Sequence, residues 1–266
     1  MTVKHIDISP LITVAMPVYN AGKYLVEAVN SIIVQTYTNW ELYVIDDGST
    51  DNAIDSIKLI KDERIIILED GLNKGLAARL NQAIDLAKGQ YFARMDQDDI
   101  SMPERFKLQL AALEANSNLD LVATRTLTIN SKNQIIGQLP FASTHQLICA
   151  KPWRGFYMPH PTWLGKIEWF RKYRYASPAS YFCEDQELLL RTYKQSQFAC
   201  LEQALLKYRL RDKINLIKSI KTRWAVLKCQ LNAFKLNEMT FNGLAIIVFI
   251  LRVLKDVFSK LAESKK

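Results

Sequence analysis

The segment that most constrains the fold of this chain is Phe92-Ala93-Arg94-Met95-Asp96-Gln97-Asp98-Asp99, an apolar run that ends in three carboxylates within four positions. The apolar part predicts a buried parallel strand. Open α/β sheets bind ligands just outside the carboxyl ends of such strands. Asp96 and Asp98 project to one side of an extended chain, where both can face a cation or its bound phosphates, while Asp99 points away. We therefore expect a metal site that also holds a phosphorylated ligand.

A second interpretation is that Asp96 to Asp99 cap the helix that follows. That helix has its own start signal in Ser101-Met102-Pro103-Glu104, which fits a capping box with an early proline. If the helix begins there, the acids upstream are left for another use.

Three apolar strands precede this segment, and we expect them over residues 11–18, 41–45 and 64–68. The segments between these strands show helical periodicity. One helix follows Asn20, which can cap it, a second carries apolar residues from 54 to 60, and a third covers 75–88 and ends at Gly89. Four strands that alternate with three helices specify a parallel sheet with right-handed crossovers. The fold class is therefore α/β, with a mostly parallel sheet flanked by helices.

The second half of the chain is less regular. We expect a helix over 102–116, a strand-rich run over 119–129 and another helix that opens at Glu184-Asp185. Glycines, prolines and aromatic residues crowd residues 131–181, which indicates loops and short strands over a binding face. We place the main domain at 1–212, with halves at about 11–100 and 101–212, and a basic helical tail at 213–266.

Two further groups at strand ends are candidates for ligand contacts. Asp46-Asp47-Gly48-Ser49 ends the 41–45 strand, and Asp47 can accept hydrogen bonds from a ribose or a base, although acids and glycine also suit turns. Asn73-Lys74-Gly75 precedes the third helix, whose first amides can face a phosphate with charge from Lys74 and Arg79, unless water solvates both side chains. Two strands that both end in paired acids favour the ligand interpretation.

Glu184-Asp185 is the best candidate for a general base. The dipole of the helix that it opens depresses the pKa of these acids, while Tyr181-Phe182-Cys183 can shield them from water and raise it. The sequence leaves both outcomes open. His160, between Pro159 and Pro161, can contact an acceptor or a phosphate, and a structural role is the alternative.

Composition excludes several classes of protein. The four cysteines are widely spaced, with no C-x-x-C pair and three histidines, which indicates a reducing compartment and disfavours structural zinc. Residues 1–10 lack the apolar core of a signal peptide, so we expect a cytoplasmic protein. The chain contains neither a G-x-x-x-x-G-K-[ST] nor a G-x-G-x-x-G motif, which disfavours P-loop and NAD enzymes.

The tail is strongly basic, because residues 207–266 hold 14 Lys and Arg against 4 Asp and Glu. We expect a basic helix over 216–236 with one apolar side, then an apolar run over 244–251 that Arg252, Lys255 and Lys260 interrupt. That run is far short of the roughly 20 residues that span a bilayer. The coincidence of basic charge and apolar stripe favours an interfacial membrane helix over nucleic-acid binding. The alternative is a helix docked on the protein's own core.

With these residues placed, the chain resembles family-2 glycosyltransferases of the GT-A fold. The resemblance covers about residues 11–195, and the matching segments occur in the order of that family. They are Pro17-Val18-Tyr19-Asn20, Gln35-Thr36-Tyr37 with Trp40-Glu41-Leu42, Asp46-Asp47-Gly48-Ser49-Thr50-Asp51, Asn73-Lys74-Gly75-Leu76 with Arg79 and Asn81, Asp96-Gln97-Asp98-Asp99 with Pro103 and Arg105, and Glu184-Asp185 with Leu188 and Arg191.

The resemblance implies a role for each group. Asp98, together with Asp96, would bind Mn²⁺ or Mg²⁺ on the diphosphate of a nucleotide sugar, most simply a UDP-sugar. Asp185 would be the base, with Glu184 as its neighbour and possible substitute, in a single displacement that inverts the anomeric centre. The remaining donor contacts would come from Pro17, Tyr19, Asn20, Asp47, Lys74, Arg79 and Asp96.

These implications predict an inverting enzyme that extends a surface polysaccharide (capsule, lipopolysaccharide or exopolysaccharide) or a lipid-linked glycan, peripheral on the inner face of the plasma membrane. Three alternatives stay open. One is a polyprenyl-phosphate sugar transferase, and another is a sugar-1-phosphate nucleotidyltransferase, whose glycine-rich N-terminal loop is missing. The third is a non-catalytic membrane assembly component. Residues 131–181 and the tail match nothing that assigns the sugar, the acceptor or the linkage.

Overall fold

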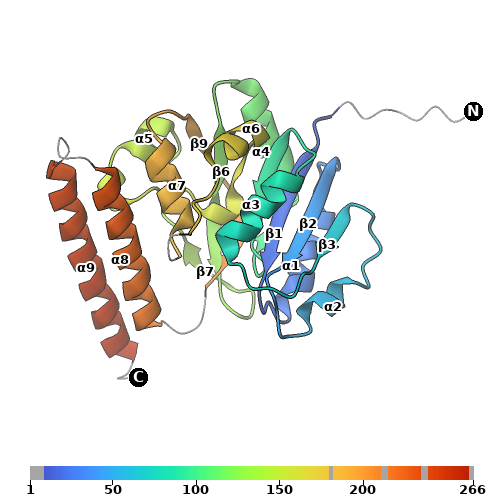
Figure 1. Cartoon of the computed structure of the whole chain (residues 1–266), viewed down its shortest axis with the longest axis horizontal. Helices are drawn as coiled ribbons and strands as arrows, with labels where there is room; N and C mark the ends of the chain where they lie inside the picture. Colours follow the sequence, from blue (N-terminus) through green and yellow to red (C-terminus); the bar gives the residue numbers. More distant parts are fainter. Residues whose placement is uncertain (1–8, 180–181, 211–214, 235–238, 264–266) are drawn as a thin grey trace, which may run out of the picture.

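A computed structural model describes residues 9–179, 182–210, 215–234 and 239–263 (Figure 1). Two predictions depend on residues outside these ranges. The expected lack of a signal peptide rests mainly on residues 1–8, and the expected domain boundary at 212 falls within 211–214.

The parallel half of the sheet confirms the four predicted strands. They are β1 (Ile12–Val18), β2 (Trp40–Asp46), β3 (Ile65–Leu68) and β4 (Tyr91–Arg94). Their spatial order is β3-β2-β1-β4, and each neighbouring pair is parallel. Their carboxyl ends therefore meet at one edge of the sheet, and this edge carries the predicted acids.

Three helices connect these strands as predicted: α1 (Tyr24–Ile33), α2 (Ala53–Ile57) and α3 (Leu76–Leu86). Two predicted helix ends were wrong. Asn20 does not cap α1, because it has a φ of 51° and its Oδ1 accepts the Thr50 amide at 2.8 Å. Gly89 does not end α3 either. It is required because a Cβ there would lie 2.5 Å from the Leu11 carbonyl oxygen.

The second half of the sheet mixes strand directions. It contains β5 (Ile100–Ser101), β6 (Leu121–Ile129), β7 (Ile135–Gln138), β8 (Leu164–Lys166) and β9 (Phe198–Arg209). The order continues from β4 as β8-β6-β9-β5, with β7 paired to β6. β8 runs antiparallel to both β4 and β6, whereas β6 and β9 are parallel. Sequence analysis missed β9, whose pairing with β6 carries two register shifts that break a simple alternation.

The predicted capping box at Ser101 was wrong. Helix α4 (Arg105–Ala115) begins after Glu104, and no side chain caps it. Ser101 is buried in β5, opposite Leu206 of β9, and its Oγ accepts a hydrogen bond from Gln35 at 3.1 Å. Because the acids at 96–99 do not cap α4 either, the capping interpretation of those acids does not hold.

Helices cover both faces of the sheet. β1 shows how the two cores arise, since Val14 and Met16 pack with α1, α2 and α4, while Ala15 packs on the opposite side. That opposite core holds α3 together with four short helices and one longer helix from the irregular half. These are α5 (His145–Cys149), η1 (Pro152–Arg154), η2 (His160–Thr162), α6 (Ile167–Tyr173) and α7 (Glu184–Thr192).

The tail forms a helical hairpin of α8 (Leu216–Ala233) and α9 (Met239–Glu263), in the place of the two helical segments that the sequence predicted. Figure 1 shows the hairpin at the end of the molecule away from β1 to β3. It packs on the main body through α7 and η1, where Gln230 donates to the Pro152 carbonyl at 2.9 Å and Trp153 contacts Phe241. Among the described residues, no helix combines the length and apolar character needed to cross a bilayer.

Candidate active site

Asp96, Asp98 and Asp99 lie in the turn that follows β4, at the carboxyl edge of the sheet. Asp96 and Asp98 are partly exposed, whereas Asp99 is only 1% exposed. The expected division, with two acids open and Asp99 turned away, is therefore present, although a turn produces it in place of an extended chain. Two carboxylates at this edge are available to a ligand.

The open acids repel one another. Burial and then the neighbouring Asp96 raise the pKa of the Asp98 carboxyl, and Arg94 partly offsets this effect. Arg94, at the end of β4, is itself buried and forms a 2.6 Å ion pair with Asp96. An added divalent cation would relieve the remaining repulsion.

Arg209 fixes this turn in place, and sequence analysis missed it. Its amide donates to Asp99 Oδ1 at 2.8 Å, and its Nε donates to the Asp98 carbonyl at 2.7 Å. The same guanidinium bonds Asn133 Oδ1 at 2.6 Å and Glu27 Oε2 at 3.0 Å. One side chain thus joins the acidic turn to the β6–β7 turn and to α1. A single arginine in a basic chain gives no sequence signal of such a role.

Gln97 joins the acidic turn to the loop after β1. Its side chain accepts from the Tyr19 amide at 2.6 Å and donates to the Tyr19 carbonyl at 3.0 Å. Asn20 then accepts the Thr50 amide, which ties the loop after β1 to the loop after β2. Tyr19 and Asn20 are exposed at this edge, whereas Pro17 is buried within β1. Pro17, which the resemblance made a donor contact, is therefore covered by neighbouring residues in this structure.

Asp47 organises the start of α3. Its carboxylate accepts the Lys74 amide at 2.7 Å, the Gly75 amide at 3.0 Å and Arg79 Nε at 2.9 Å. Arg79 is 1% exposed and also forms a 2.6 Å ion pair with Asp70. Its donors are used within the protein, so the structure gives Arg79 a supporting role in place of the expected phosphate contact. Lys74 stays at the surface, where its Nζ lies 2.6 Å from Asp70.

In the turn after β2, Asp46 stabilises the turn itself, which was the alternative to a ligand contact for the acids of this segment. Asp46 accepts the amides of Gly48 and Ser49, each at 3.2 Å. Gly48 has a φ of +75°, and a Cβ there would lie 3.0 Å from the backbone carbon of Leu72. Glycine therefore lets this turn pack directly against the loop that leads to α3.

Glu184 and Asp185 are the first two residues of α7, as predicted. The structure decides the direction of their pKa shifts, which the sequence left open. Burial, followed by repulsion from Asp185, raises the pKa of Glu184 to about 7. Burial also raises the pKa of Asp185, against the hydrogen bond from Gln186. Desolvation therefore outweighs the helix dipole at both acids.

Arg94 connects the two sets of acids. Its charge acts on Glu184 and Asp185 as well as on Asp98, and in each case it lowers the pKa. An arginine at the end of an otherwise apolar strand is a signal that sequence analysis did not use. His160 has the structural role that was the alternative: it is buried, bonds Tyr175 Oη at 2.7 Å, and burial lowers its pKa well below its usual value.

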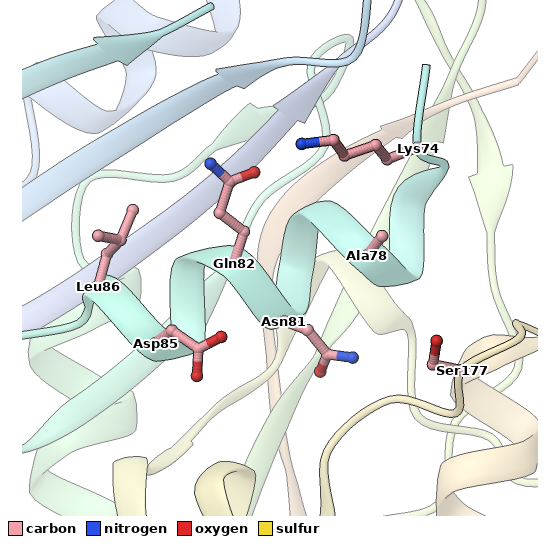
Figure 2. A pocket seen from close by; sticks show the side chains of 7 residues that line it. All are labelled: Lys74, Ala78, Asn81, Gln82, Asp85, Leu86 and Ser177. Atoms are coloured by element: carbon pink, nitrogen blue, oxygen red, sulfur yellow. The ribbon is translucent and has the colours of Figure 1, made fainter. Parts of the chain in front are cut away.

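A hollow of about 440 Å³ runs along the outer side of α3. Figure 2 shows six lining residues on or just before this helix, from Lys74 to Leu86, with Ser177 on a separate segment. Asn81 holds that segment by exchanging two 3.0 Å hydrogen bonds with the backbone of Tyr175. The hollow begins beside the Asp47 network at Lys74 and does not include the acids of the β4 turn.

The open acids fit a divalent cation that is shared with a substrate. Within the described ranges, no group of three or more His, Cys, Asp or Glu residues forms a metal cage. Mg²⁺ commonly binds through one or two carboxylates plus substrate phosphates, and Mn²⁺ also prefers oxygen ligands. Asp96 and Asp98 match this pattern. The four cysteines are free thiols in this structure.

Relatives of known name match part of the chain. EpsE of Bacillus subtilis, named a putative glycosyltransferase, is 39% identical over 46% of this chain. WfgD of Escherichia coli is 34% identical over 48% of it, and is named a UDP-Glc:α-D-GlcNAc-diphosphoundecaprenol β-1,3-glucosyltransferase. The matches span 45% of EpsE and 50% of WfgD, so the chain spans about half the length of these relatives.

Solved structures share the fold. Staphylococcus aureus TarS, in complex with UDP-GlcNAc, aligns with 93% of this chain and 72% of its own at a TM-score of 0.66 and 19% identity. The mannosyltransferase PcManGT of Pyrobaculum calidifontis, in complex with GDP-Man and Mn²⁺, aligns with 97% of this chain and 78% of its own at 0.64 and 14% identity. The family model for glycosyl transferase family 2 matches residues 13–174. The chain therefore belongs to glycosyl transferase family 2.

Proposed function

We propose that this protein transfers a sugar from a nucleoside-diphosphate donor to an acceptor hydroxyl, with inversion at the anomeric carbon. The observation that carries the proposal is the pairing of two open acids after β4 with two desolvated acids at the start of α7, with the buried Arg94 acting on both pairs. The first pair suits a charged donor. The second pair suits proton removal from an acceptor.

Asp185 is the proposed base. It takes the proton of the acceptor hydroxyl while that oxygen forms a bond to the anomeric carbon, and the bond from this carbon to the donor diphosphate breaks. Burial raises its pKa, which strengthens it as a base. Glu184 is its neighbour and possible substitute. Gln186 orients Asp185 through a 3.2 Å hydrogen bond and anchors the Phe156 amide at 2.8 Å.

Asp98 and Asp96 are the residues that would hold Mn²⁺ or Mg²⁺. A bound divalent ion supplies neutralisation of the charge that builds on the departing diphosphate. Tyr19, Asn20 and Lys74 lie along the same edge as candidate donor contacts, and Asp47 keeps the amides of Lys74 and Gly75 in place. A UDP-sugar is the first donor to test, because TarS was solved with UDP-GlcNAc and WfgD is named for UDP-glucose.

Thermal shift with a panel of nucleotide sugars, with and without Mn²⁺, tests the donor site. A ligand at a hundred times its Kd stabilises the folded state by about 2.7 kcal/mol, which gives a clear shift. We expect one nucleotide series to stabilise the protein only with metal, and Asp98→Ala to abolish the effect. Asp55→Ala, at a solvent-exposed acid on α2, is the matched control. Absence of any metal-dependent shift would remove the support for the donor site.

We further propose that the acceptor is a lipid-linked glycan or a growing surface polysaccharide, reached at the cytoplasmic face of the membrane. WfgD is named for an acceptor linked to diphosphoundecaprenol. The tail hairpin of this chain has the matching physical character, because α9 points its apolar side away from the protein. Its exposed large apolar residues are Met239, Ile246, Ile247, Ile250, Leu251, Leu254, Phe258 and Leu261.

Two charged residues of α9, Arg252 and Asp256, bond to the protein, whereas Lys255 is exposed. Asp256 forms hydrogen bonds of 2.5 and 2.7 Å with Arg223 of α8, and Arg252 donates to the Arg154 carbonyl at 2.8 Å. On α8, Lys221 and Lys228 are exposed on either side of Trp224. Basic residues around an aromatic ring suit the headgroup region of an anionic bilayer. Helix α9 thus packs on the protein by one side, and its other side is the proposed membrane-contacting face.

A further inference from the structure

Phe182, three residues before the proposed base Asp185, has an unusual conformation. Its side chain is 52% exposed, while Cys183, the next residue, is buried. Its φ of 44° falls in the left-handed region, which bulky residues rarely adopt. Such strained residues persist only where the surrounding structure holds them, and they gather at functional sites. A large ring is therefore held at the surface two residues before Glu184.

The tail helix places a cation over this ring. Lys218 Nζ of α8 lies 4.0 Å from the centroid of Phe182. The first turn of α8 is fixed by Asn215, which accepts the Lys218 amide at 3.0 Å, and it contains no acidic residue. A helix N-terminus with an added lysine favours an anion. The surface beside the base therefore combines an aromatic ring with positive charge from the tail.

We propose that Phe182 and Lys218 form an acceptor subsite for a sugar that carries a phosphate group. This inference rests on the proposed transfer reaction. The ring packs against the apolar side of the sugar, and the ammonium group pairs with the phosphate. Phe182 is three positions before Asp185 in the chain, and Lys218 lies over its ring. The hairpin would then contribute directly to acceptor binding, in addition to its proposed contact with the membrane.

Calorimetric titration of two probes tests this subsite without any need for turnover. One probe is N-acetylglucosaminyl diphosphate with a short alkyl chain, and the other is the neutral alkyl glycoside of the same sugar. We expect Phe182→Leu to weaken binding of both probes about tenfold. Lys218→Gln should weaken binding of the diphosphate about tenfold and leave the neutral glycoside unchanged. Lys221→Gln, one turn along the same exposed helix, is the matched control.

The outcomes separate the subsite from the transfer reaction. Equal weakening of both probes by Lys218→Gln, weakening of the same size by Lys221→Gln, or no binding of either probe to the intact chain would overturn the subsite. Metal-dependent stabilisation by a nucleotide sugar is measured separately on the same variants, and it should stay unchanged. Its absence from the intact chain would count against the transfer reaction alone, because the probe titration does not depend on it.

Discussion

The desolvated acids at the start of α7 make protein stability depend on pH. Glu184 has a pKa of about 7 in the folded protein against its ordinary value of 4.5, so the folded state holds an extra proton between these values. Stability should therefore fall as the pH rises through this window, by up to about 3 kcal/mol from this group. We expect Glu184→Gln to lose less stability than the parent between pH 5 and pH 8, measured by urea unfolding without metal or nucleotide. Identical pH dependence in both proteins would refute the raised pKa.

Arg209 carries the second prediction, because four of its side-chain hydrogen bonds hold the acidic turn, the β6–β7 turn and α1 together. Arg209→Met should lower the free energy of unfolding by about 2–4 kcal/mol, since it leaves buried acceptors unpaired. The donor Kd should rise about tenfold as the turn loosens. Urea unfolding and thermal shift measure the two effects. Lys207→Met removes a cation from the same strand, and an equal loss there would contradict the argument.

At single residues, the sequence predicted what depends on local pattern. The division between the open Asp96 and Asp98 and the buried Asp99 was predicted, although a turn and not an extended chain produces it. Gln97, Arg94 and Arg209 were missed because their roles depend on partners that are 78, 90 and 110 residues away, at Tyr19, Glu184 and Asp99. The pKa direction of Glu184 likewise required the burial that only tertiary packing creates.

Among the elements, the loops at the carboxyl edge hold one another in place, and Gly48 tests this packing. Gly48 and Gly71 have similar φ values of +75° and +71°, but only Gly48 meets neighbouring backbone where a Cβ would stand. Gly71→Ala should cost about 1 kcal/mol, the penalty of the left-handed conformation. Gly48→Ala should cost roughly 1–3 kcal/mol more, because the loop before α3 must shift, and it should weaken donor binding. Urea unfolding of both variants checks this, and equal costs would show that the close approach is unimportant.

Apolar periodicity located β1 to β4 and α1 to α3, whereas two cap signals failed. Ser101 and Asn20 belong to the residue types that favour the N-cap position. In this structure, each makes other hydrogen bonds and does not cap a helix. Ser101 is used inside the sheet, where it bonds Gln35. Asn20 ties two loops through Thr50. The strand β9 escaped because its bulged pairing with β6 does not alternate regularly.

For the whole molecule, the parallel half of the sheet followed from sequence because one helix connects each of its strands to the next strand along the chain, although β4 pairs with β1 and not with β3. The order β8-β6-β9-β5 did not, since strands such as β5 and β8 have two and three residues and carry too little pattern. The tail shows the same limit. Its basic and apolar character was visible, but the direction of each face depended on the ion pair between Arg223 and Asp256 and on the contacts with η1.

The outward apolar face of α9 leads to the last prediction, which concerns how the molecule sits on a membrane. We expect the protein to sediment with vesicles that contain anionic phosphatidylglycerol and much less with neutral phosphatidylcholine, and to be released by salt. Ile250→Asp combined with Leu254→Asp should reduce binding by at least tenfold, because two charges must enter the apolar layer.

Leu59→Asp is the matched control for this double variant, because Leu59 is 82% exposed and lies after α2, in the half of the molecule away from the hairpin. The control should bind anionic vesicles like the parent, since its new charge does not enter the proposed membrane face. Sedimentation velocity of the parent and the double variant without lipid tests the alternative that a second copy of the chain covers the apolar face of α9. If the parent is a dimer, and the double variant is monomeric while still binding vesicles, then α9 faces a second copy of the chain and the membrane assignment fails.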